Sequence, residues 1–421
     1  MTLFLPKAKV YSQGQIFIKD MVFENGHWID RDTISIFNPS NLLTFQNALL
    51  LPGFLDVHVH LREPGFSYKE RIETGTKAAA RGGYTAVCTM PNLNPAPDCV
   101  ENVKIQQDII DRDAVIRVYP YGCITMGQAG GGTLCDYPSL RDITIAFSDD
   151  GRGIQDENTM REAMKQIHAV GGMVVAHCED ESLLHGGCIH AGNFAKEHGY
   201  LGIVSESEWG QVKRDIELSK ETGCAYHVCH VSTKESVEYI RQAKKQGANV
   251  TCETAPHYLL LCDEDLKEEG RYKMNPPIRE KADREALIEG LLDGTIDILA
   301  TDHAPHSAEE KAKGLKDSPM GIVGIETAFP LLYTGLVKTG IVPLEVILRA
   351  MIDNPSKRFN IPMNDVLAKD ATESTVFTLD NKSVIKTEDF LSMGKATPFE
   401  NESVYAQCEC TFVGGKAVWK R

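Results

Sequence analysis

The stretch "LPGFLDVHVHLREPG" at residues 51–65 joins an apolar run to a group of polar residues. Its first part is rich in Phe, Leu and Val, which is typical of a buried strand. Two histidines, His58 and His60, alternate with valines, and Arg62 follows two residues later. Alternate residues of a strand point to the same face, so these three side chains are expected to share one region. The pattern predicts a functional site where this strand ends.

Seven further apolar runs follow, and most are separated by segments of helical composition. With residues 54–60, they occupy residues 84–92, 116–124, 143–150, 172–180, 224–232, 248–258 and 297–306. The intervening segments are rich in Glu, Lys and Ala, and several finish in Gly, as helices often do. Eight strand–helix units over roughly 250–300 residues predict a (β/α)8 barrel of the TIM type. An open, doubly wound sheet is the structural alternative.

The two ends of the chain have a different pattern from the middle. Short alternating stretches broken by Gly, Asn and Asp occur in both, as in hairpins. The pair Gly414–Gly415 lies between two apolar runs and is a turn signal. We therefore predict an α/β protein in which residues 51–364 form the barrel. Residues 1–50 and 365–421 are predicted to form one small β-sandwich domain.

Composition excludes several classes of protein. The 421 residues are 42% hydrophobic and 24% charged, which is ordinary for a soluble globular protein. No run approaches the ~18 apolar residues of a membrane span, and the first residues do not resemble a secretory signal. The net charge of −15 argues against a nucleic-acid partner. Twelve cysteines in such a chain are expected to be reduced, which predicts a cytoplasmic location; "CEC" at residues 408–410 is interpreted as packing.

Ligand-type residues gather at the predicted strand ends, where barrels carry their active sites. Imidazoles and carboxylates without cysteine favour Zn²⁺ or a similar divalent ion in a catalytic site. Six ligands are too many for one tetrahedral zinc, so two ions sharing a bridging carboxylate and a bridging water are predicted. Such a pair makes hydroxide available near neutral pH. One ion is expected to bind His58, His60 and Asp302, and the other His177 and His230, with Asp149 or Asp150 as the bridge.

Other residues near these ends indicate the substrate. Arg62 can clamp a carboxylate with two hydrogen bonds. Asn92 and Asn275 can each donate and accept, and His306 can add a second donor to an anion. Asp302 is expected to take a proton from the attacking water and deliver it to a leaving nitrogen. The set predicts hydrolysis of an amide-like bond in a small carboxylated molecule.

The remaining histidines and one glycine-rich loop are not assigned to the site. The loop "GQAGGGT" at residues 127–133 lacks the Lys-Ser/Thr of a phosphate loop. His257 and His303 adjoin the predicted ligands but are expected to pack or to lie behind them. No ligand-like partner accompanies His185, His190, His198 or His227.

Seven motifs of the chain resemble the long-chain bacterial dihydroorotases of the amidohydrolase superfamily. They are "DVHVHLREPG" (56–65), "TGTKAAARGGYTAVCTMPN" (74–92), "FSDDG" (147–151), "AHCED" (176–180), "HVS" (230–232), "NPPIR" (275–279) and "TDHAPHS" (301–307). The resemblance implies that the four site histidines bind metal and that Asp302 is both ligand and acid/base. It implies that dihydroorotate is bound by Arg62, Asn92, Asn275, His306 and backbone groups around Pro319–Gly321.

The bridging ligand separates branches of that superfamily. Many members use a carboxylated lysine, but residues 141–155, "RDITIAFSDDGRGIQ", contain no lysine. Long-chain dihydroorotases are similar in using an aspartate there, which favours Asp150 over Asp149. The resemblance further implies two Zn²⁺ per subunit, a homodimer, and the reversible cyclisation of N-carbamoyl-L-aspartate to L-dihydroorotate in pyrimidine biosynthesis.

Two alternative functions remain at this stage. Allantoinases and dihydropyrimidinases share the fold and the H-x-H pair, but they usually need the lysine carbamate, and their substrates lack the ring carboxylate. A catalytically silent dihydroorotase-like assembly subunit typically loses metal ligands, whereas this chain keeps them all. Stoichiometric zinc in the purified protein would separate an enzyme from such a subunit.

Overall fold

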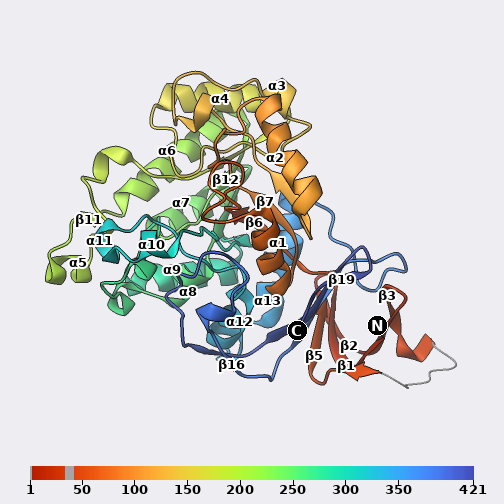
Figure 1. Cartoon of the computed structure of the whole chain (residues 1–421). Coiled ribbons are helices and arrows are strands. Elements are labelled where there is room, and N and C mark those ends of the chain that lie inside the picture. Colours follow the sequence, from red (N-terminus) through yellow and green to blue (C-terminus); the bar gives the residue numbers. More distant parts are fainter. Residues whose placement is uncertain (1, 34–41) are drawn as a thin grey trace.

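A computed structural model describes residues 2–33 and 42–421 of the chain. Parallel strands form the centre of the molecule, and a second sheet lies at one side (Figure 1). Two parallel arcs, β6-β7-β8 and β9-β12-β13-β14, supply the central strands. Their bounds are β6 (Phe54–Val59), β7 (Tyr84–Thr89), β8 (Arg117–Pro120), β9 (Met173–Ala176), β12 (Ala225–Val228), β13 (Val250–Thr254) and β14 (Ile298–Leu299).

Single residues join the two arcs into a closed barrel. Phe147 bridges Gly122 after β8 and Val174 in β9. Residues 143–150 therefore form the fourth of the eight segments of the barrel wall, here called staves, without forming a regular strand. On the other side His303, after β14, bridges Val59 in β6. The barrel prediction is confirmed, and the open sheet is excluded. Closure brings the ends of all eight staves to one rim, as barrel geometry requires.

Helices cover the outside of the barrel between the strands. Their limits follow local signals: the Thr233 hydroxyl caps α7 by accepting from Ser236 N–H, and Gly223, at φ +74°, ends α6. The longer helices are α1 (Ile72–Arg81), α2 (Val100–Asp113), α4 (Glu157–Ala169), α6 (Glu206–Thr222), α7 (Lys234–Lys245) and α9 (Lys281–Asp293). Shorter ones include α3 (Tyr137–Leu140), α5 (Asn193–His198), α8 (Pro256–Leu260), α10 (Ala308–Lys311), α11 (Gly314–Asp317), α12 (Ala328–Leu332), α13 (Leu344–Leu348) and α14 (Asn354–Phe359).

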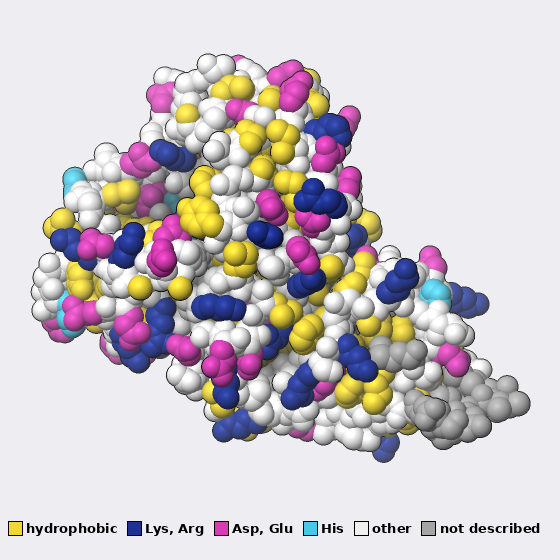
Figure 2. All heavy atoms as spheres, viewed as in Figure 1, with side chains coloured by type: hydrophobic (Ala, Val, Ile, Leu, Met, Phe, Trp, Pro, Cys, Tyr) yellow, Lys and Arg dark blue, Asp and Glu magenta, His cyan; other side chains and the backbone are white. Residues whose placement is uncertain are grey.

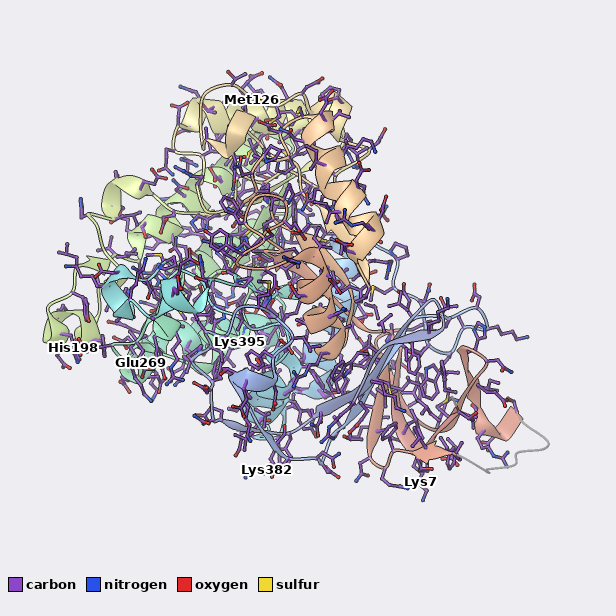
Figure 3. All side chains as sticks on the ribbon, in the orientation of Figure 1. Lys7, Met126, His198, Glu269, Lys382 and Lys395 are labelled. Atoms are coloured by element: carbon purple, nitrogen blue, oxygen red, sulfur yellow. The ribbon has the colours of Figure 1, made fainter. Side chains whose placement is uncertain are left out.

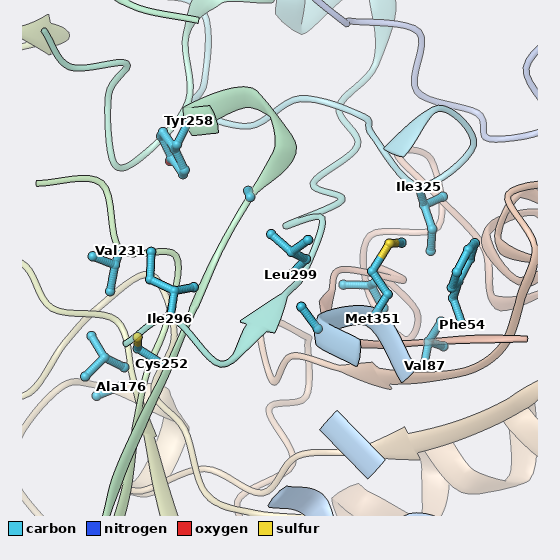
Figure 4. Close-up of a cluster of buried hydrophobic side chains, with 14 of the residues drawn as sticks. Phe54, Val87, Ala176, Val231, Cys252, Tyr258, Ile296, Leu299, Ile325 and Met351 are labelled. Atoms are coloured by element: carbon cyan, nitrogen blue, oxygen red, sulfur yellow. The ribbon is translucent and has the colours of Figure 1, made fainter. Parts of the chain in front are cut away.

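The main core lies between the barrel wall and these helices. Figure 4 shows side chains from several staves and their connections converging there, among them Phe54, Val87 and Leu299. Phe54 also contacts Phe377 of the second sheet, with ring centroids 5.7 Å apart. Each fully buried side chain of this size contributes about 1.5–3 kcal/mol by leaving water. The core therefore continues from the barrel into the second sheet.

The second sheet combines both ends of the chain, as predicted. Its order is β19-β18-β15-β5-β1-β2-β3, and β4 pairs with β1. The sheet curls, because Phe23 of β2 and Phe412 of β18 lie 4.2 Å apart although several strands separate them. Gly414–Gly415 form the turn before β19, and Cys408 and Cys410 are buried in β18. The bounds are β1 (Leu3–Ser12), β2 (Gln15–Glu24), β3 (His27–Asp30), β4 (Leu43–Thr44), β5 (Ala48–Leu51), β15 (Ser374–Thr378), β18 (Gln407–Val413) and β19 (Lys416–Lys420).

One part of the C-terminal region leaves this sheet and packs on the barrel. It contains the small pair β16 (Ser383–Val384) and β17 (Ser403–Val404), and Phe390 and Phe399 from it contact Val323 and Leu331. Figure 2 shows acidic and basic side chains interspersed over the visible face. Within the described residues, no helix combines the length and apolar character needed to cross a membrane.

Candidate metal centre and active site

Six predicted ligands meet at the carboxyl rim of the barrel, and all six are buried. His58 and His60 end β6, and His177 and His230 follow β9 and β12. Their ligand atoms and the two carboxylates form two groups in which every atom lies within 4.8 Å of the others. One group is His58, His60 and Asp302, and the other is Asp150, His177 and His230.

Asp150 lies between the two groups. Its Oδ1 is 3.5 Å from His58 Nε2, 3.5 Å from His230 Nε2 and 3.8 Å from His177 Nδ1. Its Oδ2 is 3.6 Å from His60 Nε2. Burial opposes ionisation of Asp150, but the surrounding histidines, His58 above all, hold its pKa well below the ordinary value. An ionised carboxylate in this position can contact an ion in each group.

Asp149, the alternative bridge, faces away from the histidines. Its carboxylate accepts hydrogen bonds from Ile124 N–H at 2.8 Å and from the backbone and hydroxyl groups of Thr125. Gly130 N–H donates to it as well, at 3.3 Å. These contacts fix the loop after β8. The side chains of Asp149 and Asp150 thus point in different directions, so the first holds a loop and the second faces the histidines.

The chemistry of the ligand set fits divalent cations. His58 Nε2 and Asp150 Oδ1 are buried, face each other, and have no hydrogen-bond partner among the described residues. Such atoms are costly unless a ligand or ion satisfies them. Cys229 also lies within reach of these two residues. Burial raises the pKa of its thiol well above the ordinary value.

Backbone strain coincides with this rim. Arg62, His230 and Asp302 have φ values of +58°, +31° and +46°, a region that residues other than glycine rarely adopt. Each such residue costs of order 1–3 kcal/mol, and the surrounding packing must offset it. The left-handed conformation turns the chain at the strand end and aims the side chain into the site.

Glu253 of β13 supports the first group from behind, and sequence reasoning missed it. Its Oε1 lies 2.5 Å from His58 Nδ1, and its Oε2 lies 3.1 Å from His227 Nε2. Burial opposes charge on His58, but the carboxylates of Glu253 and Asp150 raise its pKa well above the ordinary value. The only sequence signal was one acidic residue inside the apolar run at 248–258. A carboxylate on the far ring nitrogen orients a ligand histidine and makes it more basic.

We expect Glu253→Gln to lower zinc affinity by about 10–100-fold, because His58 loses the acceptor that orients it. Competition with a chromophoric chelator measures the affinity. Glu373→Gln is the matched control, since Glu373 is a buried carboxylate that pairs with Arg117 at 2.7 Å instead of a site histidine. Equal zinc affinity in Glu253→Gln and the wild type would show that the contact has no such role.

A second carboxylate, Glu179, lies behind the other group. It accepts from Asn275 Nδ2 at 3.0 Å and faces His177 Nε2 at 3.5 Å. It thereby ties a predicted metal ligand to a predicted substrate ligand. Its position two residues after His177 in "AHCED" was the available signal, because alternation places both side chains on one face.

A cavity of about 290 Å³ opens above the two groups. Arg62 enters it from the end of β6, where its Nε donates to Pro305 O at 3.2 Å. Asn92, which follows β7, donates from its Nδ2 to Asp150 O at 2.6 Å and so holds this segment in place. The predicted residues in the wall are His60, Arg62, Asn92, Asp150, His177, His230, Asn275, Asp302, His306 and Gly321.

The loop after the last strand contributes differently from the prediction. Met320 and Gly321 line the cavity, but Pro319 does not, and its carbonyl accepts from Lys311 Nζ at 2.8 Å. Gly321 has φ +130°, and a Cβ there would lie 2.8 Å from Ala304 O. Only glycine fits that close approach of loop and strand.

The unassigned histidines lie outside the two groups. His303 faces Glu70 at 3.6 Å, and His257 packs on Tyr258 with centroids 4.2 Å apart. His190 contacts Arg279. The glycine-rich loop at 127–133 adjoins the exposed Met126, which Figure 3 shows at the edge of the molecule opposite Lys382.

Comparisons with known proteins agree with this geometry. A family model described as "Dihydro-orotase-like" matches residues 47–236. A Bacillus cereus (strain B4264) protein named "Dihydroorotase" is 45% identical over 421 residues, covering 100% of this chain and 98% of its own. A Bacillus cytotoxicus protein of the same name is 46% identical over 422 residues, with the same coverage.

Solved structures share the fold. "L-Hydantoinase (Dihydropyrimidinase) from Arthrobacter aurescens" has a TM-score of 0.85 at 25% identity, covering 99% of this chain and 96% of that one. The dihydropyrimidinase from Brevibacillus agri NCHU1002 has a TM-score of 0.83 at 20% identity, covering 100% and 95%. The barrel, the two groups of candidate ligands at its rim and the 45% identity to a dihydroorotase over the whole chain lead to one conclusion. The chain belongs to the dihydroorotase family of cyclic amidohydrolases.

Proposed function

We propose that this protein is a zinc-dependent dihydroorotase that interconverts N-carbamoyl-L-aspartate and L-dihydroorotate in pyrimidine biosynthesis. The observation that carries the proposal is Arg62, a half-buried cation that lines the cavity beside the two ligand groups. A ring carboxylate gives Arg62 a partner, and the ligand groups lie where the ring amide would react. The relatives named dihydroorotase support the same assignment.

The ligand groups suit two Zn²⁺ ions per subunit. His58, His60 and Asp302 would hold one, His177 and His230 the other, and Asp150 would contact both. When bound, such ions lower the pKa of a shared water and polarise a carbonyl oxygen. Glu253 and Glu179 keep His58 and His177 in the orientation that this requires.

Asp302 is the proposed acid/base. Its Oδ1 lies 3.1 Å from His60 Nε2 at the cavity wall. Burial opposes ionisation, but His58 and His60 lower the pKa of Asp302 below its ordinary value, so the group is an ionised carboxylate near neutral pH. In the hydrolytic direction it takes the proton of the attacking water and delivers it to the ring nitrogen as the amide bond breaks.

The residues of the cavity wall would orient the substrate. Arg62 and Asn92 would hold the exocyclic carboxylate, and Asn275, fixed by Glu179, would meet the polar edge of the ring. His306 and backbone groups at Met320–Gly321 border the carboxylate side. This positioning brings the amide carbonyl over the ligand groups, which is the main contribution of such a wall to rate.

The test combines metal analysis with an ultraviolet assay of dihydroorotate loss, with hydantoin and allantoin as control substrates. We expect stoichiometric zinc and turnover of dihydroorotate alone. Turnover of hydantoin or allantoin instead would assign the protein to the functions of its structural neighbours. Zinc-free protein without activity would identify a silent assembly subunit.

Three further predictions belong to the same proposal. The barrel at residues 51–364 carries the chemistry, and residues 1–50 and 365–421 form the accompanying β domain. The protein works in the cytoplasm on a small-molecule substrate, without nucleic acid or membrane. It forms a homodimer, which sedimentation of the purified chain measures.

A further inference from the structure

Lys69 and His306 form a contact beside the cavity that no step above uses. Lys69 lies in the loop after β6, and its side chain is only 15% exposed. Its Nζ is 3.2 Å from His306 Nδ1. The other ring nitrogen, Nε2, is 2.8 Å from the carbonyl oxygen of Met320. Both nitrogens of this imidazole therefore have a partner.

The chemistry of these partners determines where the ring carries its proton. An ammonium group only donates, so His306 Nδ1 must accept from Lys69. A carbonyl only accepts, so Nε2 must carry the hydrogen that Met320 O receives. Burial and the charges of Arg62 and Lys69 lower the pKa of His306 to about 3, which agrees with a neutral ring. The contacts thus select the Nε2–H tautomer.

The surrounding charges show why Lys69 is needed for this choice. Glu310, on α10, places its Oε2 3.6 Å from His306 Nδ1, and its Oε1 pairs with Lys69 Nζ at 3.0 Å. Lys311 and Arg62 are the other charged groups near the ring. Without Lys69, a proton on Nδ1 would face a free carboxylate, and the ring would become Nδ1–H or doubly protonated.

The selected tautomer presents its N–H at the cavity wall. His306, Met320 and Gly321 all line the cavity, as does Arg62, whose Nε is bonded to the neighbouring Pro305 carbonyl. A carboxylate beside Arg62 would compete with Met320 O for the Nε2 hydrogen. A neutral acceptor is a weaker partner for an N–H than an anion, so the exchange favours an anionic ligand.

We propose that Lys69 is a positioning residue for carboxylate recognition, because it holds His306 in the Nε2–H form that donates to the substrate carboxylate beside Arg62. This inference rests on the proposed dihydroorotase function for its ligand. Lys69 itself does not line the cavity, so it acts through the imidazole.

The first test reads the tautomer without substrate. Zinc-loaded protein labelled with ¹⁵N-histidine gives ring-nitrogen shifts, and loss of a signal pair in His306→Gln assigns His306. We expect Nε2–H in the wild type and in the control Lys77→Met, which removes an exposed lysine of α1 that pairs with Glu73. In Lys69→Met we expect the Nδ1–H or doubly protonated form.

The second test separates binding from turnover. We expect Lys69→Met to raise KM for dihydroorotate about tenfold or more, while kcat changes less than about threefold. Lys69→Arg should restore both tautomer and KM, because a guanidinium also only donates. An unchanged tautomer with an unchanged KM in Lys69→Met would overturn the proposal.

A further variant keeps the test available if Lys69→Met does not fold. In Lys69→Gln the amide can donate or accept and Glu310 loses its cation, so we expect the Nδ1–H or doubly protonated form there too; an unchanged Nε2–H form with an unchanged KM in Lys69→Gln would overturn the proposal. Failure of the proposed function and failure of the proposed role of Lys69 can be told apart. If the wild type does not turn over dihydroorotate, the proposed function is wrong, whereas the NMR result still decides what Lys69 does to His306.

Discussion

Asp150→Asn is expected to remove bound zinc and to lower kcat/KM for dihydroorotate by at least about 10³-fold. The physical reason is position: the Asp150 carboxylate contacts both ligand groups, at 3.5–3.8 Å from four imidazole nitrogens. An amide has no net charge and offers one acceptor oxygen, so it cannot serve both groups. Metal analysis of the purified variant, with steady-state kinetics, measures both effects.

The neighbouring residue supplies the matched control. Asp149→Asn makes the same chemical change one residue away, where the carboxylate accepts from the backbone at residues 124, 125 and 130. We expect lower thermal stability, by about 1–3 kcal/mol for a buried acceptor that loses charged hydrogen bonds, and near-normal zinc. Zinc loss in Asp149→Asn with normal zinc in Asp150→Asn would reverse the assignment of the bridge.

Arg62→Met is expected to lower kcat/KM for dihydroorotate by about 10²–10³-fold, with near-normal zinc content. A bidentate bond between guanidinium and carboxylate contributes a few kcal/mol at a site shielded from water, and methionine fills the space without a donor. Most of the change should appear in KM. Steady-state kinetics with metal analysis on the same preparation measures it.

Arg112→Met is the control for this change, because Arg112 lies exposed on α2 and pairs with Asp113. It should leave zinc and kinetics unchanged. If Arg62→Met loses zinc as well, Arg62 has a structural task at the strand end, where its φ is +58°. The carboxylate argument for dihydroorotate would then fail.

The sequence predicted the barrel because its strands and helices carry strong local patterns. Residues 54–60 and the seven later runs all became staves, and Gly223 and Thr233 delimit helices as their types suggest. The fourth stave was harder to place, since residues 143–150 join the wall through the bridges of Phe147 and a few backbone hydrogen bonds, without forming a regular strand. A strand this short gains its conformation from its neighbours rather than from its own residues.

The ligand residues were also accessible from the sequence, because alternation in strands and the common rim of a barrel are geometric rules. The residues that contact these ligands from behind were harder to find. Glu253 and Glu179 left only weak signals, an acidic residue in an apolar run and a position two residues after His177, and Lys69 is a single charged residue in a loop. Pro319 shows the reverse case: its motif was recognisable, yet its carbonyl accepts from Lys311 Nζ and the residue does not line the cavity.

The sequence by itself thus determined the fold class, the family resemblance and the candidate ligand residues, because these depend on residue type and spacing along the chain. The tertiary structure decided which of two adjacent aspartates lies between the two groups and which partners face the ring nitrogens of His306. Both depend on contacts between residues far apart in the chain. Such contacts exist only when barrel closure brings the first strand against the last, through Val59 and His303.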